Sequence, residues 1–360
     1  MKYPRHLSLI LSLTLVCLTS AVTAQSLTPQ ARKKLDNDIR YLVGQQSSFA
    51  DIAVAVVDAE GVVSQVNGSR PFPLASVFKL PLMVAVLKSQ EEGSFPSSGS
   101  VLTVTTNDQC IGSGSLKNQG VGTTVSVDKA MRLMMSVSDN TATDLLFRRL
   151  GCANLDLWLK KQGYKTSEIL LTNRQAWLLS LGKVPGWGKT TPEERVRRWE
   201  KLDRAGKLAL GAKIESAAQN MTLSQFQAIE NASTGTQTEA QDNLLAARLD
   251  NKMSALDLAN LLVDLDSGRL LSGQSRATAF SVLAGQKYHS RLPAQLASST
   301  DVYHKTGTLS GVRNDAGLLY TNNSKSGVAV VFLTQDIRPG AGSKMDRVAA
   351  QIAKLVESAY

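Results

Sequence analysis

The residues best suited to chemistry in this sequence are Ser76 and Lys79, within the run Ala75-Ser76-Val77-Phe78-Lys79-Leu80-Pro81. A serine and a lysine three positions apart lie on the same side of a helix. At a helix start the serine oxygen also lies among unpaired backbone N–H groups, which stabilise negative charge. A nearby, partly desolvated lysine can release its proton and act as a base, so the pair can supply a nucleophile without histidine. Because Ser-x-x-Lys also occurs by chance at capped helix starts, further motifs must support this interpretation.

Two further motifs follow in the chain, Ser138-Asp139-Asn140 and Lys305-Thr306-Gly307. Taken singly, the first also fits a helix-capping cluster and the second a strand end with a turn glycine. All three motifs in this order resemble the class A serine β-lactamases and the related penicillin-binding proteins. The resemblance covers most of the chain, with residues 174–236 as the clear exception.

The resemblance implies a role for each polar residue. Ser76 would attack the substrate carbonyl and form an acyl-enzyme, with an oxyanion hole made by the backbone N–H groups of Ser76 and Thr308. Ser138 would pass a proton to the leaving nitrogen. Asn140 would hold both Lys79 and a substrate amide through its carbonyl and NH₂ groups.

The third motif implies a site for the carboxylate that penicillins and terminal D-alanine share. Lys305 would supply a cation, and Thr306 and Thr308 would supply hydroxyls on either side of Gly307. Arg313, shortly after this strand, is a further candidate partner of the carboxylate.

Release of the acyl group requires a general base in class A β-lactamases, where a Glu-x-x-x-Asn pattern activates and orients a water. Residues 170–175, where the resemblance places this pattern, contain no suitable acid, whereas Glu239 and Asn243 match it later in the chain. We therefore predict an insertion over 174–236 and an Ω-like loop over 237–253 that contains both residues. The alternative is that Glu239 is a solvated loop acid. Either Lys79 or Glu239 acting through water could be the acylation base.

The leading functional hypothesis is a class A-like serine β-lactamase that hydrolyses the β-lactam amide. The alternative is a D,D-peptidase, or penicillin-binding protein, acting on peptidoglycan stem peptides. A third hypothesis is a non-catalytic protein that binds cell-wall fragments. The expected partner is accordingly a small-molecule β-lactam, with peptidoglycan as the alternative.

The N-terminus predicts the compartment. Lys2 and Arg5 precede an apolar segment over 7–18 and the small residues before Ala24, so residues 1–24 resemble a cleaved signal peptide. We expect a periplasmic or secreted monomer without a stable membrane anchor. The net charge of +10 suits an anionic cell envelope. The predicted export and the 5% aromatic content argue against nucleic-acid binding.

Metal and cofactor chemistry is not expected, because the sequence has no Cys/His cluster. Two cysteines, Cys110 and Cys152, remain after residue 24, and their spacing leaves a disulfide open.

The elements that must position these residues are predicted from apolar periodicity. Two β-rich runs at 52–57 and 62–66 and three more at 303–308, 317–320 and 328–333 predict one antiparallel sheet built from both ends of the chain. We therefore predict an α/β (α+β) fold, with a five-stranded antiparallel sheet between N- and C-terminal helices and an additional all-helical lobe. The sheet domain would comprise 25–66 and 286–360, and the helical domain 67–285.

The insertion 174–236 predicts two or three short helices with a basic face. It contains Trp177, Trp187 and Trp199, which would either bury a small core of its own or form a binding surface.

Overall fold

The computed structural model describes residues 27–360 apart from 234, 322, 323 and 325. The predicted signal peptide lies outside the described residues. The helices are α1 Pro29–Gly44, α2 Lys79–Glu91, α3 Val127–Ser136, α4 Asn140–Leu150, α5 Cys152–Lys161, α6 Asn173–Ser180, α7 Pro192–Glu200, α8 Arg204–Ala217, α9 Leu223–Ser233, α10 Glu239–Leu249, α11 Ala255–Asp266, α12 Gly273–Leu283 and α13 Gly342–Ala359. The strands are β1 Asp51–Asp58, β2 Gly61–Val66, β3 Pro71–Pro73, β4 Val101–Thr103, β5 Thr124–Ser126, β6 Lys252–Ser254, β7 Asp301–Leu309, β8 Val312–Tyr320 and β9 Val328–Gln335.

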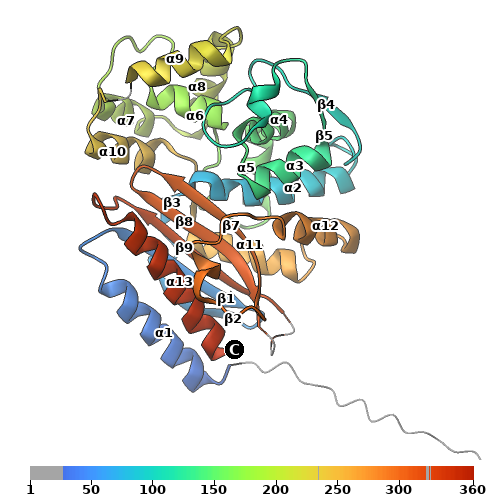
Figure 1. Cartoon of the computed structure of the whole chain (residues 1–360), viewed down its shortest axis with the longest axis vertical. Coiled ribbons are helices and arrows are strands. Elements are labelled where there is room, and N and C mark those ends of the chain that lie inside the picture. Colours follow the sequence, from blue (N-terminus) through green and yellow to red (C-terminus); the bar gives the residue numbers. More distant parts are fainter. Residues whose placement is uncertain (1–26, 234, 322–323, 325) are drawn as a thin grey trace, which may run out of the picture.

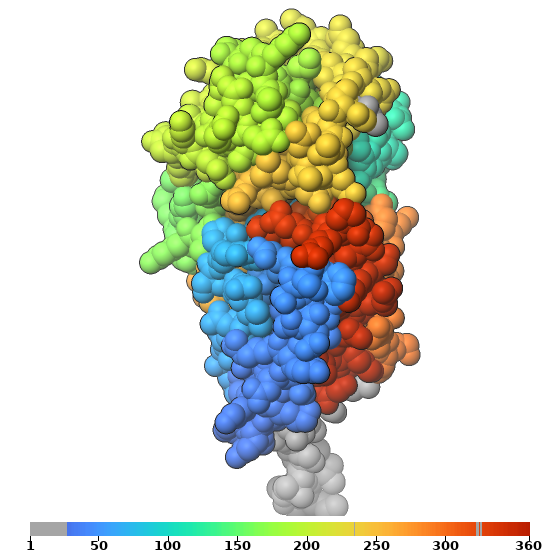
Figure 2. Space-filling view, turned by 90° about the vertical axis from the view of Figure 1, so that its left-hand side faces the viewer, coloured from blue at the N-terminus to red at the C-terminus, as the bar shows by residue number. Residues whose placement is uncertain are grey.

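Five of the strands form one antiparallel sheet in the order β2-β1-β9-β8-β7 (Figure 1). Strand β1 from the start of the chain pairs with β9 from its end, so that Val54 lies opposite Phe332. The same two ends lie side by side on the surface in Figure 2, in blue and red, because α1 packs against α13. These contacts confirm the predicted five-stranded sheet and its assembly from both ends of the chain.

Both faces of this sheet are buried. Successive side chains of a strand point to opposite faces, and in β1 Val54 and Val56 join a core with α1 and α13, whereas Ala53 and Ala55 join a second core that includes α11. Burial on both faces explains the continuous apolar run over 52–57. Helix α11 packs against the sheet although it belongs to the segment predicted as the helical domain.

Helix α2 runs through the centre of the molecule, and every residue from Lys79 to Leu87 is buried. It follows a 3₁₀ helix, Ala75–Phe78, that carries Ser76. Pro81 lies in the first turn of α2, where a backbone N–H needs no intrahelical partner, so the proline is tolerated there.

Several smaller features bear on the predictions. Cys110 is buried and Cys152 is partly exposed, and both thiols are free. Among the described residues, no helix combines the length and apolar character needed to cross a bilayer.

The insertion contains four helices, α6 to α9, instead of the two or three predicted. The prediction of an Ω-like loop over 237–253 is wrong, because helix α10 occupies most of this segment. Thr238 caps α10 by accepting from the N–H of Gln241, whose side chain accepts in turn from the Thr238 N–H. This capping box gives the segment a strong helix start.

The insertion and α10 share a third apolar core, at the upper left of Figure 1. Trp199 is buried in it, and Trp177 and Trp187 pack against it, which supports the hypothesis that the tryptophans serve a core. The centre is Phe226 of α9, which is fully buried and lies 5.0 Å from the Arg174 guanidinium.

We predict that Phe226→Ala lowers the free energy of unfolding by about 3–5 kcal/mol, because the truncation leaves a cavity in this third core. Urea denaturation followed by circular dichroism measures the change. Leu157→Ala is the control, since this leucine is exposed and its truncation should cost less than ~0.5 kcal/mol. A loss below ~1 kcal/mol for Phe226→Ala would show that the insertion packs loosely.

Candidate active site

Ser76 lies at a turn held from two sides. Ala75, the preceding residue, has a φ of 46°, a conformation that L-residues adopt only under constraint. Its N–H donates to Asp250 Oδ2 at 2.6 Å. Strand β7 passes against the same turn, since a Cβ on Gly307 would lie 2.5 Å from the Leu74 carbonyl oxygen. Only glycine allows the strand to approach the turn that carries Ser76 this closely.

Lys79 follows Ser76 by one turn and is fully buried. Its Nζ donates to the Ser138 carbonyl at 2.8 Å, to Ser138 Oγ at 3.0 Å and to Asn140 Oδ1 at 2.8 Å. Burial lowers the pKa of Lys79 to about 8, although the nearby Asp144 opposes the shift. The amine can therefore lose its proton near neutral pH, as a general base requires.

The Ser138-Asp139-Asn140 motif opens helix α4. Asp139 caps the helix by accepting from the Ala142 N–H at 2.9 Å. Ser138 has a φ of 59°, which marks a second constrained position at the site. The motif is thus a helix cap that also presents two side chains to Lys79.

Lys305 approaches Ser138 from the sheet. Its Nζ donates to Ser138 Oγ at 3.2 Å and to the Thr306 carbonyl at 2.8 Å, and burial lowers its pKa well below the usual value. Two lysines therefore donate to one hydroxyl oxygen, which has two lone pairs. The hydroxyl proton of Ser138 is then free to point toward a third group, as a proton relay requires.

Asn140 connects the site to the loop between β4 and β5. While its Oδ1 accepts from Lys79, its Nδ2 donates to the Ile111 carbonyl at 2.9 Å, which leaves one amide proton for a substrate.

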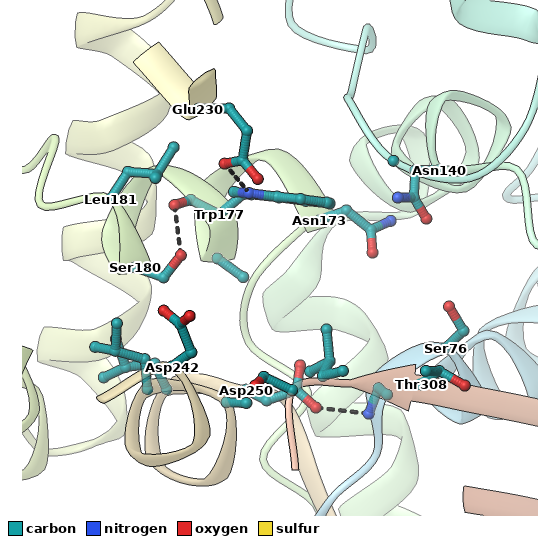
Figure 3. Close-up of a pocket in the computed structure, with 18 of the residues that line it drawn as sticks. Ser76, Asn140, Asn173, Trp177, Ser180, Leu181, Glu230, Asp242, Asp250 and Thr308 are labelled. Atoms are coloured by element: carbon teal, nitrogen blue, oxygen red, sulfur yellow. Dashed lines mark hydrogen bonds between the residues drawn. The ribbon is translucent and has the colours of Figure 1, made fainter. Parts of the chain in front are cut away.

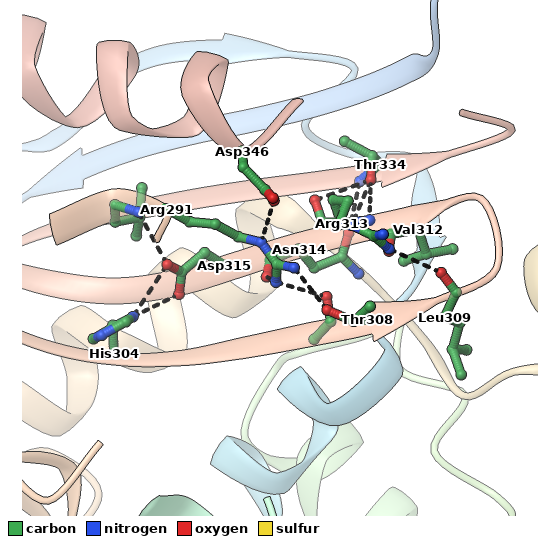
Figure 4. A network of polar contacts seen from close by, with 12 residues as sticks. Arg291, His304, Thr308, Leu309, Val312, Arg313, Asn314, Asp315, Thr334 and Asp346 are labelled. Atoms are coloured by element: carbon green, nitrogen blue, oxygen red, sulfur yellow. Dashed lines mark hydrogen bonds and ion pairs between the residues drawn. The ribbon is translucent and has the colours of Figure 1, made fainter. Parts of the chain in front are cut away.

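The arginine nearest the predicted carboxylate site is Arg291, which the sequence analysis did not identify. It donates to Thr308 Oγ1 at 2.6 Å and to the Gly307 carbonyl at 2.9 Å, and its Nε is paired with Asp346 (Figure 4). No short motif marks it, because it precedes the third motif in a connection outside the strands. Arg313 instead donates to the carbonyls of Leu309 and Val312 and does not line the cavity described below.

A cavity of about 450 Å³ opens above Ser76. Ser76, Asn140 and Thr308 lie at one end, whereas side chains of α6, α9 and α10 form the other (Figure 3). That residues of the insertion line the cavity beside Ser76 was not predicted from the sequence. The cavity volume suits a small-molecule ligand.

The structure does not bring Glu239 to Ser76. The residue is exposed at the first turn of α10 and is not among the described residues that line the cavity. Asn243 contacts a different partner, because its Oδ1 accepts from Ser310 Oγ at 2.6 Å and its Nδ2 donates to the Ile337 carbonyl. The helical conformation of 239–249 explains this outcome, since Glu239 lies at the exposed start of α10, whereas the residues of α10 that line the cavity belong to its later turns.

Asn173 occupies the cavity wall at the point where the family resemblance placed an acid. Figure 3 shows its amide between Trp177 and Asn140. The backbone and side-chain N–H groups of Asn173 both donate to Asp144 at 2.8 Å, and burial raises the pKa of Asp144 to about 7. An amide cannot accept a proton from water as a carboxylate does.

Metal-ligand geometry is absent from the described residues. No group of three or more His, Cys, Asp or Glu side chains there could hold an ion.

The chain matches a sequence model described as the beta-lactamase enzyme family over residues 33–360. It is 25% identical over 295 residues to the beta-lactamase regulatory protein BlaB of Streptomyces cacaoi, across 80% of this chain and 86% of that protein. Two solved structures are similar. A mutant of PBP-A, an acyl-enzyme complex with penicillin G, has a TM-score of 0.62 at 22% identity, over 91% of this chain and 96% of that one. A representative of class A β-lactamase from Bacteroides cellulosilyticus has a TM-score of 0.64 at 18% identity, over 91% of this chain and 98% of that one.

We predict that the acylation rate rises with pH and levels off above about pH 8, because only the neutral amine of Lys79 accepts the serine proton. Lys79→Arg should reduce the rate by ~10³-fold, since a guanidinium does not lose its proton. Stopped-flow absorbance with a chromogenic cephalosporin measures both. Lys213→Arg, at an exposed position of α8, is the matched control. A flat pH profile, or an arginine variant that keeps more than about a tenth of the rate, would contradict this role.

Proposed function

This chain belongs to the beta-lactamase enzyme family, and from that premise we propose that it is a serine hydrolase that β-lactams acylate at Ser76 and that releases the acyl group slowly. It would thus act as a penicillin-binding enzyme of the D,D-peptidase kind on D-alanyl peptides. Slow release makes the alternative hypothesis of the sequence analysis the leading one.

The hydrogen bonds of Lys79 are the observation that supports acylation of Ser76. The buried Nζ of Lys79 joins Ser138 and Asn140, one helical turn from the nucleophile. Neutral Lys79 takes the proton of Ser76 as Oγ attacks the carbonyl. Ser138 then gives its proton to the nitrogen as the C–N bond breaks, and Lys79 restores the proton of Ser138. The ester on Ser76 is the acyl-enzyme.

Two observations support slow release of the acyl group. The cavity wall carries the amide of Asn173, and Glu239 lies outside the cavity. The described acids that line the cavity are Glu230, Asp242 and Asp250. Glu230 and Asp242 lie at the end opposite Ser76 in Figure 3. Without a carboxylate aimed at a water beside the ester, hydrolysis loses the factor of ~10²–10⁴ that a general base supplies.

β-Lactamase turnover is the second candidate, favoured by Asp250. This carboxylate accepts from the N–H of Ala75, beside the nucleophile, and burial raises its pKa to about 6, a suitable value for a base. Its bond to the backbone argues for a structural role, because that oxygen already accepts a proton donor.

The compartment is part of the proposal. We place the protein outside the cytoplasm as a monomer, in agreement with the leader-like N-terminus and with substrates that occur in the cell envelope.

The test is a time course of intact-protein mass spectrometry with benzylpenicillin. We expect one adduct of the full penicillin mass, located on Ser76, that persists for minutes or longer. Ser76→Ala should form none. Rapid release with product accumulation would instead establish a β-lactamase, and Asp250→Asn would then identify the base if it slowed the release.

Glu239→Gln is the control for the release step, and we expect its adduct to persist as long as that of the wild type. No adduct and no product with the wild type would contradict covalent chemistry and favour the third hypothesis, a non-catalytic protein that binds cell-wall fragments.

A further inference from the structure

The end of the cavity away from Ser76 is built by the insertion and α10. Its apolar lining comes from α6, from the residue that follows α6 and from α10, and it comprises Ala176, Trp177, Leu181, Leu245, Ala246 and Leu249. In Figure 3 this end is continuous with the space beside Ser76 and Thr308. A substrate group bonded to the acylated carbon can therefore extend into it.

Carboxylates are the charged groups on this lining. Glu230 of α9 and Asp242 of α10 lie at the far end, and no described residue that lines the cavity is a lysine, arginine or histidine. Two arginines of the insertion, Arg174 and Arg195, do not line the cavity. Arg174 donates to backbone carbonyls that include that of Gln109, and Arg195 donates to that of Ser180, so both point into the protein.

Asp242 is exposed to the solvent, and its carboxylate makes no ion pair with a described side chain. Partial desolvation raises its pKa. The lining is thus negative in a protein whose net charge is +10. A cationic group of a ligand would therefore be attracted to this end of the cavity.

Trp177 adds an aromatic surface. Its Nε1 donates to Glu230 at 2.7 Å, which fixes the indole with its ring edge against Gly112. A Cβ on Gly112 would lie 2.9 Å from this ring and 2.8 Å from Asn140 Nδ2, so the indole also borders the catalytic amide. Indole faces attract alkylammonium groups, and a carboxylate next to the ring strengthens the attraction.

The two ends of the site therefore differ in their charged groups. Lys305 contacts Ser138 and Arg291 contacts Thr308, next to the position expected for the substrate carboxylate on the leaving-group side of the bond that breaks. The far end, with its apolar stem and its acids, faces the acyl side. A substrate with a carboxylate on one side and an ammonium on the other would match both ends.

We propose that the insertion-built end of the cavity is a subsite for an ammonium group carried on an aliphatic stem by the acyl portion of the substrate. The subsite rests on the proposed acylation of Ser76 and specifies its substrate class, which is acyl groups with a terminal primary amine. Asp242 and Glu230 bind the ammonium, and Trp177 and the leucines contact the stem.

The test uses two penicillins that share the same nucleus. One carries a 6-aminohexanoyl side chain and the other its 6-acetamidohexanoyl derivative, which keeps the stem and removes the charge. Second-order rate constants of acylation are measured by mass spectrometry. We expect the ammonium compound to react about tenfold faster at low salt, with a preference that declines as ionic strength rises.

Variants assign the preference to this end of the cavity. Asp242→Asn should reduce the rate ratio to below about threefold, and Glu230→Gln should reduce it while the amide oxygen still accepts from Trp177. Glu239→Gln removes the same charge from the same helix outside the cavity, and we expect it to keep the wild-type ratio.

Equal rates for the two penicillins in the wild type would overturn the subsite, as would a ratio that Asp242→Asn leaves unchanged. Benzylpenicillin separates this failure from that of the proposed function. If it acylates Ser76 while the pair shows no preference, only the subsite is wrong. If none of the three penicillins forms an adduct, the proposed acylation fails and the subsite fails with it.

Discussion

The buried ammonium of Lys79 is the interaction on which the rest of the structure depends. Placing a lysine in the core is costly unless every proton finds an acceptor, and Ser138 and Asn140 supply those acceptors. To do so, the loop before α4 adopts a constrained conformation at Ser138 and α4 begins at Asn140. Lys305 meets the same hydroxyl from the sheet, so one oxygen joins the helical part of the molecule to β7. The same burial lowers the pKa of Lys79 to about 8, which suits the base that we propose it to be.

The insertion changes what surrounds this centre. Where the family resemblance predicts a loop with a general base, the chain has Asn173 at the start of α6, tied to the buried Asp144. The four inserted helices then form a lobe with its own core and contribute Trp177 and Glu230 to the cavity. On the function proposed above, this replacement leaves hydrolysis of the ester without a general base. It also places two carboxylates, Glu230 and Asp242, on the lining of the cavity.

The sequence allowed much of this to be predicted, and the failures have identifiable causes. Apolar runs predicted the sheet strands because burial on both faces leaves a strong signal, and three local motifs predicted residues that the structure brings together around Lys79. The site around Glu239 could not be predicted from spacing, because Glu-x-x-x-Asn has little information and Thr238 with Gln241 makes the segment a capped helix. Arg291 and Trp177 reach the site through tertiary packing alone. Arg313 was chosen for its proximity in the chain, yet its side chain turns toward the backbone of its own hairpin.

The most direct test of this account is a crystal structure of the protein after reaction with benzylpenicillin. We predict an ester on Ser76 Oγ, its carbonyl oxygen between the backbone N–H groups of Ser76 and Thr308, and Asn173 as the side chain that faces the ester from the wall. No carboxylate should lie within hydrogen-bond distance of a water beside the ester carbon. A rearranged α10 that brings Glu239 or another acid to such a water would contradict the account, as would an adduct on any residue other than Ser76.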